Sequence, residues 1–203
     1  VPAVVGVRGL MESISGGAPV VVDGTDGVVI VSPSEGQISK YQKMQANLLM
    51  DRRAADAFIG KPTKTRDHHL VKLMANIGTD ADADMITSSD AEGVGLVRTE
   101  FLFMQRGDLP GMQEQYLEYQ TIMQAANGRP VTFRTMDAGG DKGLPYLGLP
   151  KEENPFLGLR AVRISLKYKE MFKTQLKALF CAGSFGDLRV MLPMISSCEE
   201  LDA

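Results

Sequence analysis

The chain has 203 residues, of which 44% are hydrophobic and 23% charged, a composition typical of a globular protein with one large domain or two smaller ones. Its net charge of −3 excludes general nucleic-acid binding, because no basic excess exists to displace counterions from a phosphate backbone. No apolar run has membrane-spanning length, and the two cysteines, Cys181 and Cys198, are typical of a reduced cytoplasmic chain rather than a disulfide scaffold.

The first 33 residues are rich in valine and glycine and predict a small β-rich piece. Two β-branched runs, Val20–Val22 and Val28–Val31, flank the turn Asp23–Gly27, which is the pattern of a β-hairpin. A piece of this size buries too little apolar surface to fold alone, so we expect it to complete a larger domain.

A helix is predicted next. Ser34 and Gln37 have the spacing of a capping box, and apolar residues then recur at helical intervals. A polar run follows, in which His68 and His69 are expected to be exposed rather than to act as nucleophiles. Residues 34–69 are therefore interpreted as a linker helix and connection.

From residue 70 onward, predicted strands alternate with predicted helices. The strands are expected at Leu70–Asn76, Gly93–Val97, Val131–Phe133, Arg160–Ser165 and Leu188–Ile195. The main helices are expected at residues 111–126 and 168–182, with the thiol of Cys181 packed beside an apolar helix face. This alternation is typical of an α/β fold with a parallel sheet.

Polar residues follow two of the predicted strands at the points where they end. Arg98 and Glu100 follow the second strand, and Arg134 and Asp137 follow the third. The carboxyl ends of parallel strands line the ligand site in such folds, and a guanidinium group can bind a phosphate or carboxylate with two parallel hydrogen bonds. With Arg160 close in sequence, these residues predict an anion pocket, although a strand-end ion pair is the alternative for each arginine taken singly.

The stretch Arg134–Lys142 has two interpretations when it is read alone. Gly139 and Gly140 break the strand and let the backbone approach a ligand closely, which favours an anion clamp built on Arg134. A buried structural pair between Arg134 and Asp137 explains the same residues. The motif by itself favours neither interpretation.

Four segments resemble a known family in the same order. They are Glu92–Met104, Arg134–Lys142, Pro150–Arg160 and Leu188–Ile195, and they are similar to the motifs of phosphoenolpyruvate-utilising enzymes. The closest resemblance is to the enzyme I family of the bacterial sugar phosphotransferase system. Pro2–Gly6 resembles the end of the phosphohistidine domain of that family, so the resemblance covers essentially the whole chain.

The resemblance implies a fold and a domain division. Residues 70–203 would form the N-terminal part of a phosphoenolpyruvate-binding (βα)8 TIM-type barrel, with about the first five of its strands. Residues 34–69 would be the linker helix and connection. Residues 1–33 would be the C-terminal tail of the phosphohistidine domain.

The resemblance also implies a reaction. Enzymes of this family transfer the phosphoryl group of phosphoenolpyruvate to an enzyme histidine and then to the carrier protein HPr, in the cytoplasm, during sugar uptake. Arg98 and Arg134 would hold the phosphate of the substrate, and Arg160 would line the same pocket. No catalytic residue of the family falls in this chain.

Several parts of the family pattern have no counterpart here. The histidine that is phosphorylated lies upstream of Pro2–Gly6 in the family, and the Mg²⁺ ligands and the catalytic cysteine are expected beyond Ala203. We therefore expect a fragment of a protein that is a homodimer at full length. The chain alone is expected to be inactive, so pyruvate production from phosphoenolpyruvate would contradict this expectation.

Three other functions stay open at this point. The chain could belong to a regulatory, nitrogen-type paralogue of the phosphotransferase, or to a non-catalytic anion-binding half-barrel. A pyruvate phosphate dikinase or phosphoenolpyruvate synthase is disfavoured, because these enzymes typically lack the run Pro150–Gly158.

Overall fold

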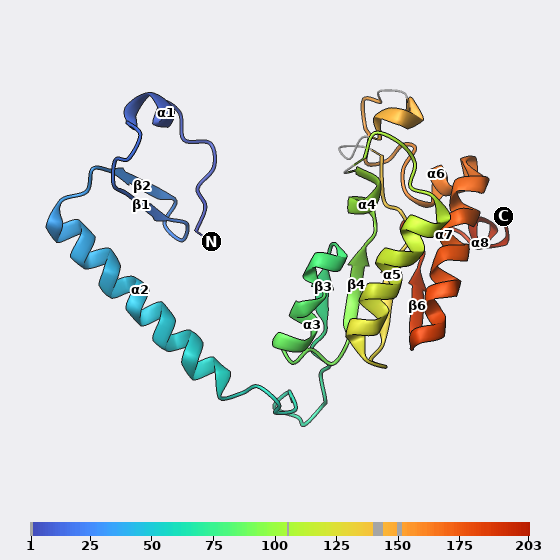
Figure 1. Cartoon of the computed structure of the whole chain (residues 1–203), viewed down its shortest axis with the longest axis horizontal. Helices are drawn as coiled ribbons and strands as arrows, with labels where there is room; N and C mark the ends of the chain where they lie inside the picture. Colours follow the sequence, from blue (N-terminus) through green and yellow to red (C-terminus); the bar gives the residue numbers. More distant parts are fainter. Residues whose placement is uncertain (1, 105, 140–143, 150–151) are drawn as a thin grey trace. The chain divides into compact units, whose positions relative to one another are not determined.

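The structure, a computed structural model, describes residues 2–104, 106–139, 144–149 and 152–203 (Figure 1). The chain forms two compact units, Val1–Ile59 and Gly60–Ala203. Among the described residues, no helix combines the length and the apolar character that a membrane span requires.

The first unit contains the predicted hairpin. After the short helix α1 (Leu10–Ser13), β1 (Val20–Asp23) pairs antiparallel with β2 (Val28–Val31). The carboxylate of Asp23 accepts hydrogen bonds from the backbone N–H groups of Thr25, at 2.9 Å, and Asp26, at 3.2 Å. These bonds close the turn, because an aspartate side chain can satisfy the backbone donors that follow it.

The predicted helix of this unit is α2 (Glu35–Asp56), and its capping box is confirmed. The hydroxyl oxygen of Ser34 accepts from the N–H of Gln37 at 3.4 Å, while the side-chain oxygen of Gln37 accepts from the N–H of Ser34 at 2.9 Å. None of the residues of α2 is buried.

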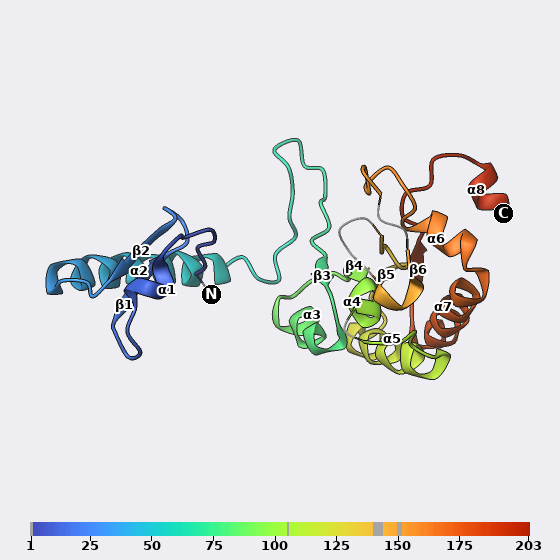
Figure 2. The same cartoon turned by 90° about the horizontal axis from the view of Figure 1, so that it is seen from above.

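The second unit contains a four-stranded parallel sheet in the order β3-β4-β5-β6. Its strands are β3 (Ala75–Ile77), β4 (Val94–Arg98), β5 (Val131–Arg134) and β6 (Leu188–Met191). Figure 2 shows helices α3 (Asp84–Ser88), α5 (Met112–Ala126) and α7 (Lys169–Ala182) along one face of this sheet. The remaining elements are η1 (Asp80–Asp82), α4 (Glu100–Met104), η2 (Pro145–Leu147), α6 (Val162–Lys167), η3 (Gly183–Phe185) and α8 (Glu199–Asp202).

The main core lies between the sheet and these helices. Alternate residues of β5 are buried, since successive side chains of a strand point to opposite faces. Strand β4 buries Val94 and Val97, on either side of an irregularity in its register with β5. Phe133 of β5 packs edge-to-face against Tyr119 of α5, with ring centroids 5.1 Å apart. The fully buried members of this core include Ile77, Ile86, Val94, Val97, Tyr119, Ile122, Met123, Val131, Phe133 and Leu179.

The predicted strand at Arg160–Ser165 is wrong, because the chain forms α6 there instead. Ala161 has φ +51° and donates its N–H to the carbonyl of Ala138 at 3.0 Å, and the helix begins directly after it. Val162 and Ile164, whose β branching favours a strand, are both buried by the helix. The sheet of the described residues therefore has four strands and not about five.

The predicted strand at Leu70–Asn76 also needs correction. Parallel pairing with β4 starts only at Ala75, and Leu70 and Leu73 are exposed to 61% and 56%. His68 and His69 are exposed in the preceding loop, as predicted. Cys181 is exposed on α7, whereas we expected it to be packed.

Candidate functional site

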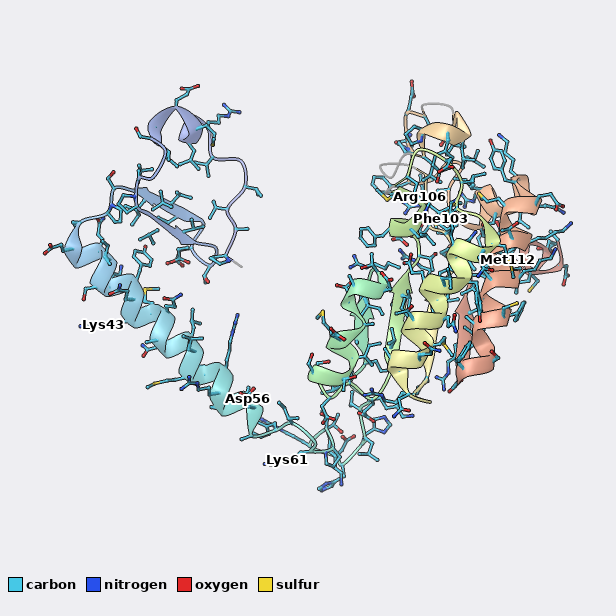
Figure 3. The ribbon with its side chains drawn as sticks, in the orientation of Figure 1. Lys43, Asp56, Lys61, Phe103, Arg106 and Met112 are labelled. Carbon is cyan, nitrogen blue, oxygen red and sulfur yellow. The ribbon has the colours of Figure 1, made fainter. Side chains whose placement is uncertain are left out.

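The predicted arginines of the second and third strands lie side by side at the carboxyl end of the sheet. Arg98 ends β4 and Arg134 ends β5, and the two are direct partners in the parallel register. After β4 the chain continues into α4. Phe103 and Arg106 therefore lie at the same end of the second unit as the carboxyl ends of the strands (Figure 3). Parallel pairing therefore brings together two residues that are far apart in the sequence.

Carboxylates hold the guanidinium groups of Arg134 and Arg160. Arg134 contacts the carboxylate of Glu100 at 2.5 Å and that of Asp137 at 3.2 Å. Arg160 donates to the other oxygen of Asp137 at 3.0 Å from Nη2 and 3.3 Å from Nε. Asp137 thus bridges the two arginines, and its side chain is 9% exposed, compared with 0% for Glu100.

Arg98 has a different environment. Its guanidinium carbon lies 4.9 Å from the centre of the Phe101 ring, in a cation–π arrangement. Its buried Nε has no hydrogen-bond partner, and among the described residues no carboxylate lies within ion-pair distance of its side chain. The charge of Arg98 is therefore the least neutralised of the three predicted site residues within the described part of the chain.

Asp82 shows the long-range effect of that charge. Its carboxylate accepts from the N–H groups of Gly78 and Thr79, at 2.9 and 3.1 Å, and caps η1. These hydrogen bonds, with a smaller electrostatic contribution from Arg98, hold the pKa of Asp82 below its ordinary value.

The buried pair and the anion clamp are not exclusive interpretations of the Arg134 stretch. The structure contains the Arg134–Asp137 pair, which extends to Arg160, and this cluster lies at the strand ends where a ligand site was predicted. Gly139 has φ +108°, and a Cβ atom there would lie 2.6 Å from the carbonyl oxygen of Leu159. The remainder of the motif, residues 140–142, lies outside the described residues.

Three guanidinium groups and two carboxylates together give the candidate site one net positive charge. These groups belong to Arg98, Arg134, Arg160, Glu100 and Asp137. Arg134 and Arg160 are preorganised, because buried carboxylates fix their orientation before any ligand arrives. An anion that binds here must compete with Glu100 and Asp137 for the same donors. The arrangement suits a small, highly charged oxyanion better than a neutral ligand.

The described residues do not fit a magnesium site. No group of three or more His, Cys, Asp and Glu side chains among them could hold a metal ion. The two carboxylates nearest the arginines, Glu100 and Asp137, already accept hydrogen bonds from guanidinium groups.

Helix α4 packs into a second, smaller core. Phe103 is buried there together with Met136, Ala138, Leu144 and Ile164. The hydroxyl of Tyr146 donates to the carbonyl of Phe103 at 2.8 Å, and burial raises the pKa of this hydroxyl to about 12, so that it stays protonated. This core supports the residues that follow β4 and β5.

The carboxyl group of Glu118 is expected to make the free energy of unfolding depend on pH. Burial on α5, followed by the charge of Asp80, raises the pKa of Glu118 to about 7. Because its pKa in the folded state lies above the unfolded value of 4.5, its contribution to stability is complete below pH 4.5 and is lost as pH rises through about 7. We expect Glu118→Gln to raise the free energy of unfolding by about 1–2 kcal/mol at pH 8, after allowance for partial exposure, and to change it little at pH 4.5.

Urea unfolding at both pH values measures this difference, and Glu153→Gln, at an exposed position, is the matched control. If the two variants respond to pH in the same way, Glu118 does not carry the effect.

Comparison with known proteins assigns the chain to a family. Residues 52–203 match the PEP-binding domain of the PEP-utilising enzymes. The chain is 48% identical over 200 residues to the phosphoenolpyruvate-protein phosphotransferase of Priestia megaterium, and 44% and 43% identical to the proteins of the same name from Bacillus subtilis and Haemophilus influenzae. Each alignment covers 98% of this chain and 35% of the relative, so the chain spans about a third of their length. The chain belongs to the family of PEP-utilising enzymes.

Proposed function

We propose that this chain supplies part of the phosphoenolpyruvate site of a phosphoenolpyruvate–protein phosphotransferase. Arg98 and Arg134 would contact the phosphate of the substrate, and Arg160 would line the same pocket. The observation that supports the proposal is the register between Arg98 and Arg134, in which the two arginines are direct partners at the carboxyl end of the sheet. The relatives that bear this name include one that is 48% identical to the chain over 200 residues.

The geometry suits the charge of the proposed substrate. Phosphoryl transfer develops negative charge on the phosphate oxygens, and fixed guanidinium groups stabilise that charge without reorganising. Glu100 and Asp137 would keep Arg134 and Arg160 in position before binding and would give up some of these hydrogen bonds to the phosphate. Arg98, which lies over the ring of Phe101, would offer its charge at the smallest cost.

The sheet supports a partial (βα)8 barrel as part of the same proposal. Its parallel strands follow one another in chain order, and α3, α5 and α7 lie along one face (Figure 2). A barrel wall has this arrangement, with helices outside and strand ends that carry the ligand. The domain division at residues 1–33, 34–69 and 70–203 is proposed on the resemblance.

The wider reaction is also proposed from the family. The phosphoryl group would pass to an enzyme histidine and then to the HPr carrier in sugar uptake, in the cytoplasm and in a homodimer. Mg²⁺ would assist by neutralising phosphate charge, held by ligands outside this chain.

A titration with phosphoenolpyruvate tests the proposed site. Two-dimensional NMR of the arginine Nε–H groups should show shifts for Arg98, Arg134 and Arg160, with an affinity in the millimolar range, about −4 kcal/mol, for an incomplete site. Arg189, which is exposed and paired with Asp187 at 2.9 Å, should not shift. We expect Arg134→Met to weaken binding at least about tenfold, because it removes a charge-assisted contact.

Arg189→Met is the control and should leave the affinity unchanged. The proposal fails if phosphoenolpyruvate leaves the three resonances unmoved, or if Arg134→Met and Arg189→Met have equal effects.

A further inference from the structure

A buried glutamine of α7 connects the two strand ends that carry the arginines. The side-chain oxygen of Gln175 accepts from the N–H of Met136 at 3.0 Å, and its nitrogen donates to the hydroxyl of Thr99 at 3.0 Å. Thr99 directly follows Arg98, and Met136 comes two residues after Arg134. A single amide therefore bridges the chain that leaves β4 and the chain that leaves β5.

The hydroxyl of Thr99 extends this bridge to Arg134. It donates to the backbone carbonyl of Arg134 at 2.8 Å, and it has only one proton to give. Thr99 must therefore accept from Gln175, while the N–H of Met136 requires an acceptor. These two demands fix the orientation of the Gln175 amide, with its oxygen toward β5 and its nitrogen toward β4.

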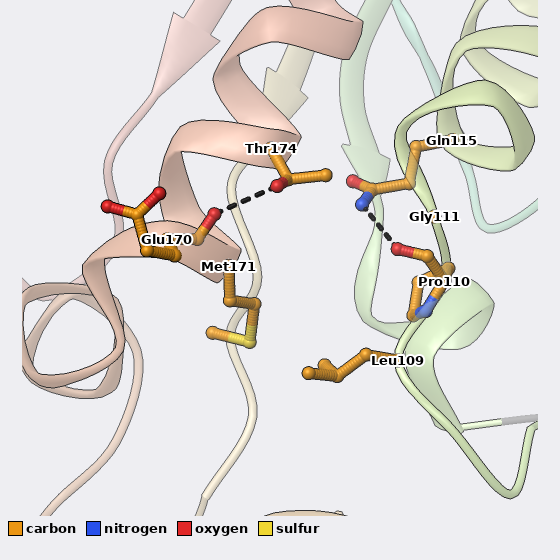
Figure 4. Close-up of a pocket in the computed structure, with 7 residues that line it drawn as sticks. All are labelled: Leu109, Pro110, Gly111, Gln115, Glu170, Met171 and Thr174. Carbon is orange, nitrogen blue, oxygen red and sulfur yellow. Dashed lines mark hydrogen bonds between the residues drawn. The ribbon is translucent and has the colours of Figure 1, made fainter.

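The same amide is anchored on its outer side. The nitrogen of Gln175 also lies 3.2 Å from the hydroxyl of Tyr119, which donates to the side-chain oxygen of Gln115 at 3.2 Å. Burial raises the pKa of Tyr119 well above its usual value, so its proton stays in place. Gln115 in turn donates to the carbonyl of Pro110 at 2.9 Å, beside a groove of about 290 Å³ between α5 and α7 (Figure 4).

Gln175 is a polar residue buried on an apolar helix face, and packing alone does not account for it. Its side chain is 2% exposed and lies on the face of α7 that carries Ala178, Leu179 and Ala182, where an apolar residue would pack without any need for partners. A buried amide is costly unless its donors and acceptor are satisfied. Here the described contacts satisfy them with Thr99 and Met136 at the two strand ends and with the hydroxyl of Tyr119 on α5.

We propose that Gln175 is a positioning residue, which holds the ends of β4 and β5 so that Arg98 and Arg134 face one anion. This inference rests on the proposed function, because it concerns the same site. Gln175 touches neither guanidinium group in the described contacts, so it acts through Thr99 and through the backbone at Met136.

The test compares Gln175→Met with Gln115→Met in the 203-residue chain. Both changes remove a buried amide of the same hydrogen-bonded chain, but only Gln175 contacts the strand ends. With each variant fully folded by circular dichroism, Gln175→Met should weaken phosphoenolpyruvate binding about tenfold, whereas Gln115→Met should change it less than about twofold. Equal effects of the two variants, or wild-type affinity for Gln175→Met, overturn the proposal.

Variants of Thr99 provide a rescue that a packing role would not. Thr99→Val keeps the shape but loses the hydroxyl, and it should weaken binding as Gln175→Met does. Thr99→Ser keeps the hydroxyl and should bind like the wild type. If the serine variant is as weak as the valine variant, packing of the methyl group controls the site and the proposal fails.

A readout without substrate separates this inference from the proposed function. Hydrogen exchange at the amide of Met136 should become faster in Gln175→Met and stay unchanged in Gln115→Met, because only the first loses its acceptor. If the wild-type chain shows no response to phosphoenolpyruvate, the proposed function fails. The exchange rates then decide whether Gln175 holds the strand ends, and unchanged exchange at Met136 in Gln175→Met overturns that role.

Discussion

Phe133→Ala is expected to lower the free energy of unfolding of the second unit by about 3–5 kcal/mol. The ring of Phe133 is fully buried and packs edge-to-face on Tyr119, so its removal leaves a cavity and ends an aromatic contact. Thermal and urea unfolding measure the loss. Phe180→Ala is the matched control, because the ring of Phe180 is 67% exposed and its removal should cost less than about 0.5 kcal/mol.

Phe133 also precedes Arg134, so the cavity should loosen the strand end. We expect weaker phosphoenolpyruvate binding in folded Phe133→Ala, in addition to lower stability. A loss of stability no larger than that of Phe180→Ala would show that Phe133 does not carry the core.

Gly139→Ala is expected to destabilise the chain by about 2–4 kcal/mol and to displace Arg160. Gly139 has φ +108°, which disfavours any side chain, and an added Cβ would lie 2.6 Å from the carbonyl oxygen of Leu159 and 2.7 Å from the Cβ of Arg160. Arg160 would have to move, and its contact with Asp137 at 3.0 Å would lengthen. Unfolding measurements and the Nε–H resonance of Arg160 report the two effects.

Gly148→Ala distinguishes the cost of backbone strain from the cost of the steric clash expected in Gly139→Ala. Gly148 also has positive φ, +56°, but an added Cβ would have no atom within 4 Å. This variant should lose only about 1 kcal/mol and leave the Arg160 resonance in place. If the two glycine variants lose the same free energy of unfolding, the nearby backbone of Leu159 and Arg160 does not exclude a Cβ atom at position 139.

Local signals in the sequence were sufficient for much of the fold. The hairpin followed from β-branched runs around an Asp-Gly turn, and α2 followed from the Ser34–Gln37 capping box. Strands β4 and β5 were predicted to within a residue, because short Val-rich runs end there in charged residues. From these two strands alone, the proximity of Arg98 and Arg134 could be expected.

The remaining features depend on tertiary contacts that no local pattern contains. Arg160–Ser165 has the β branching of a strand but forms a helix, because the turn at Ala161 redirects the chain. The pairing of Arg134 with Glu100 depends on the register of β4 and β5. Gln175 was missed because a polar residue on a predicted helix is ordinarily expected on the exposed face. Its position on the same face as Leu179, four residues later, was the available signal.

The shared position of Asp137 has a consequence for selectivity. Asp137 already serves Arg134 and Arg160 as an internal anion, so an external anion gains only the difference between its own interactions and those that it displaces. An anion with one charge offers these arginines little that Asp137 does not. A phosphate dianion offers more charge and more acceptor oxygens. The carboxylate of Asp137 therefore favours ligands that carry more negative charge than it does itself, because only these can displace it from Arg134 and Arg160.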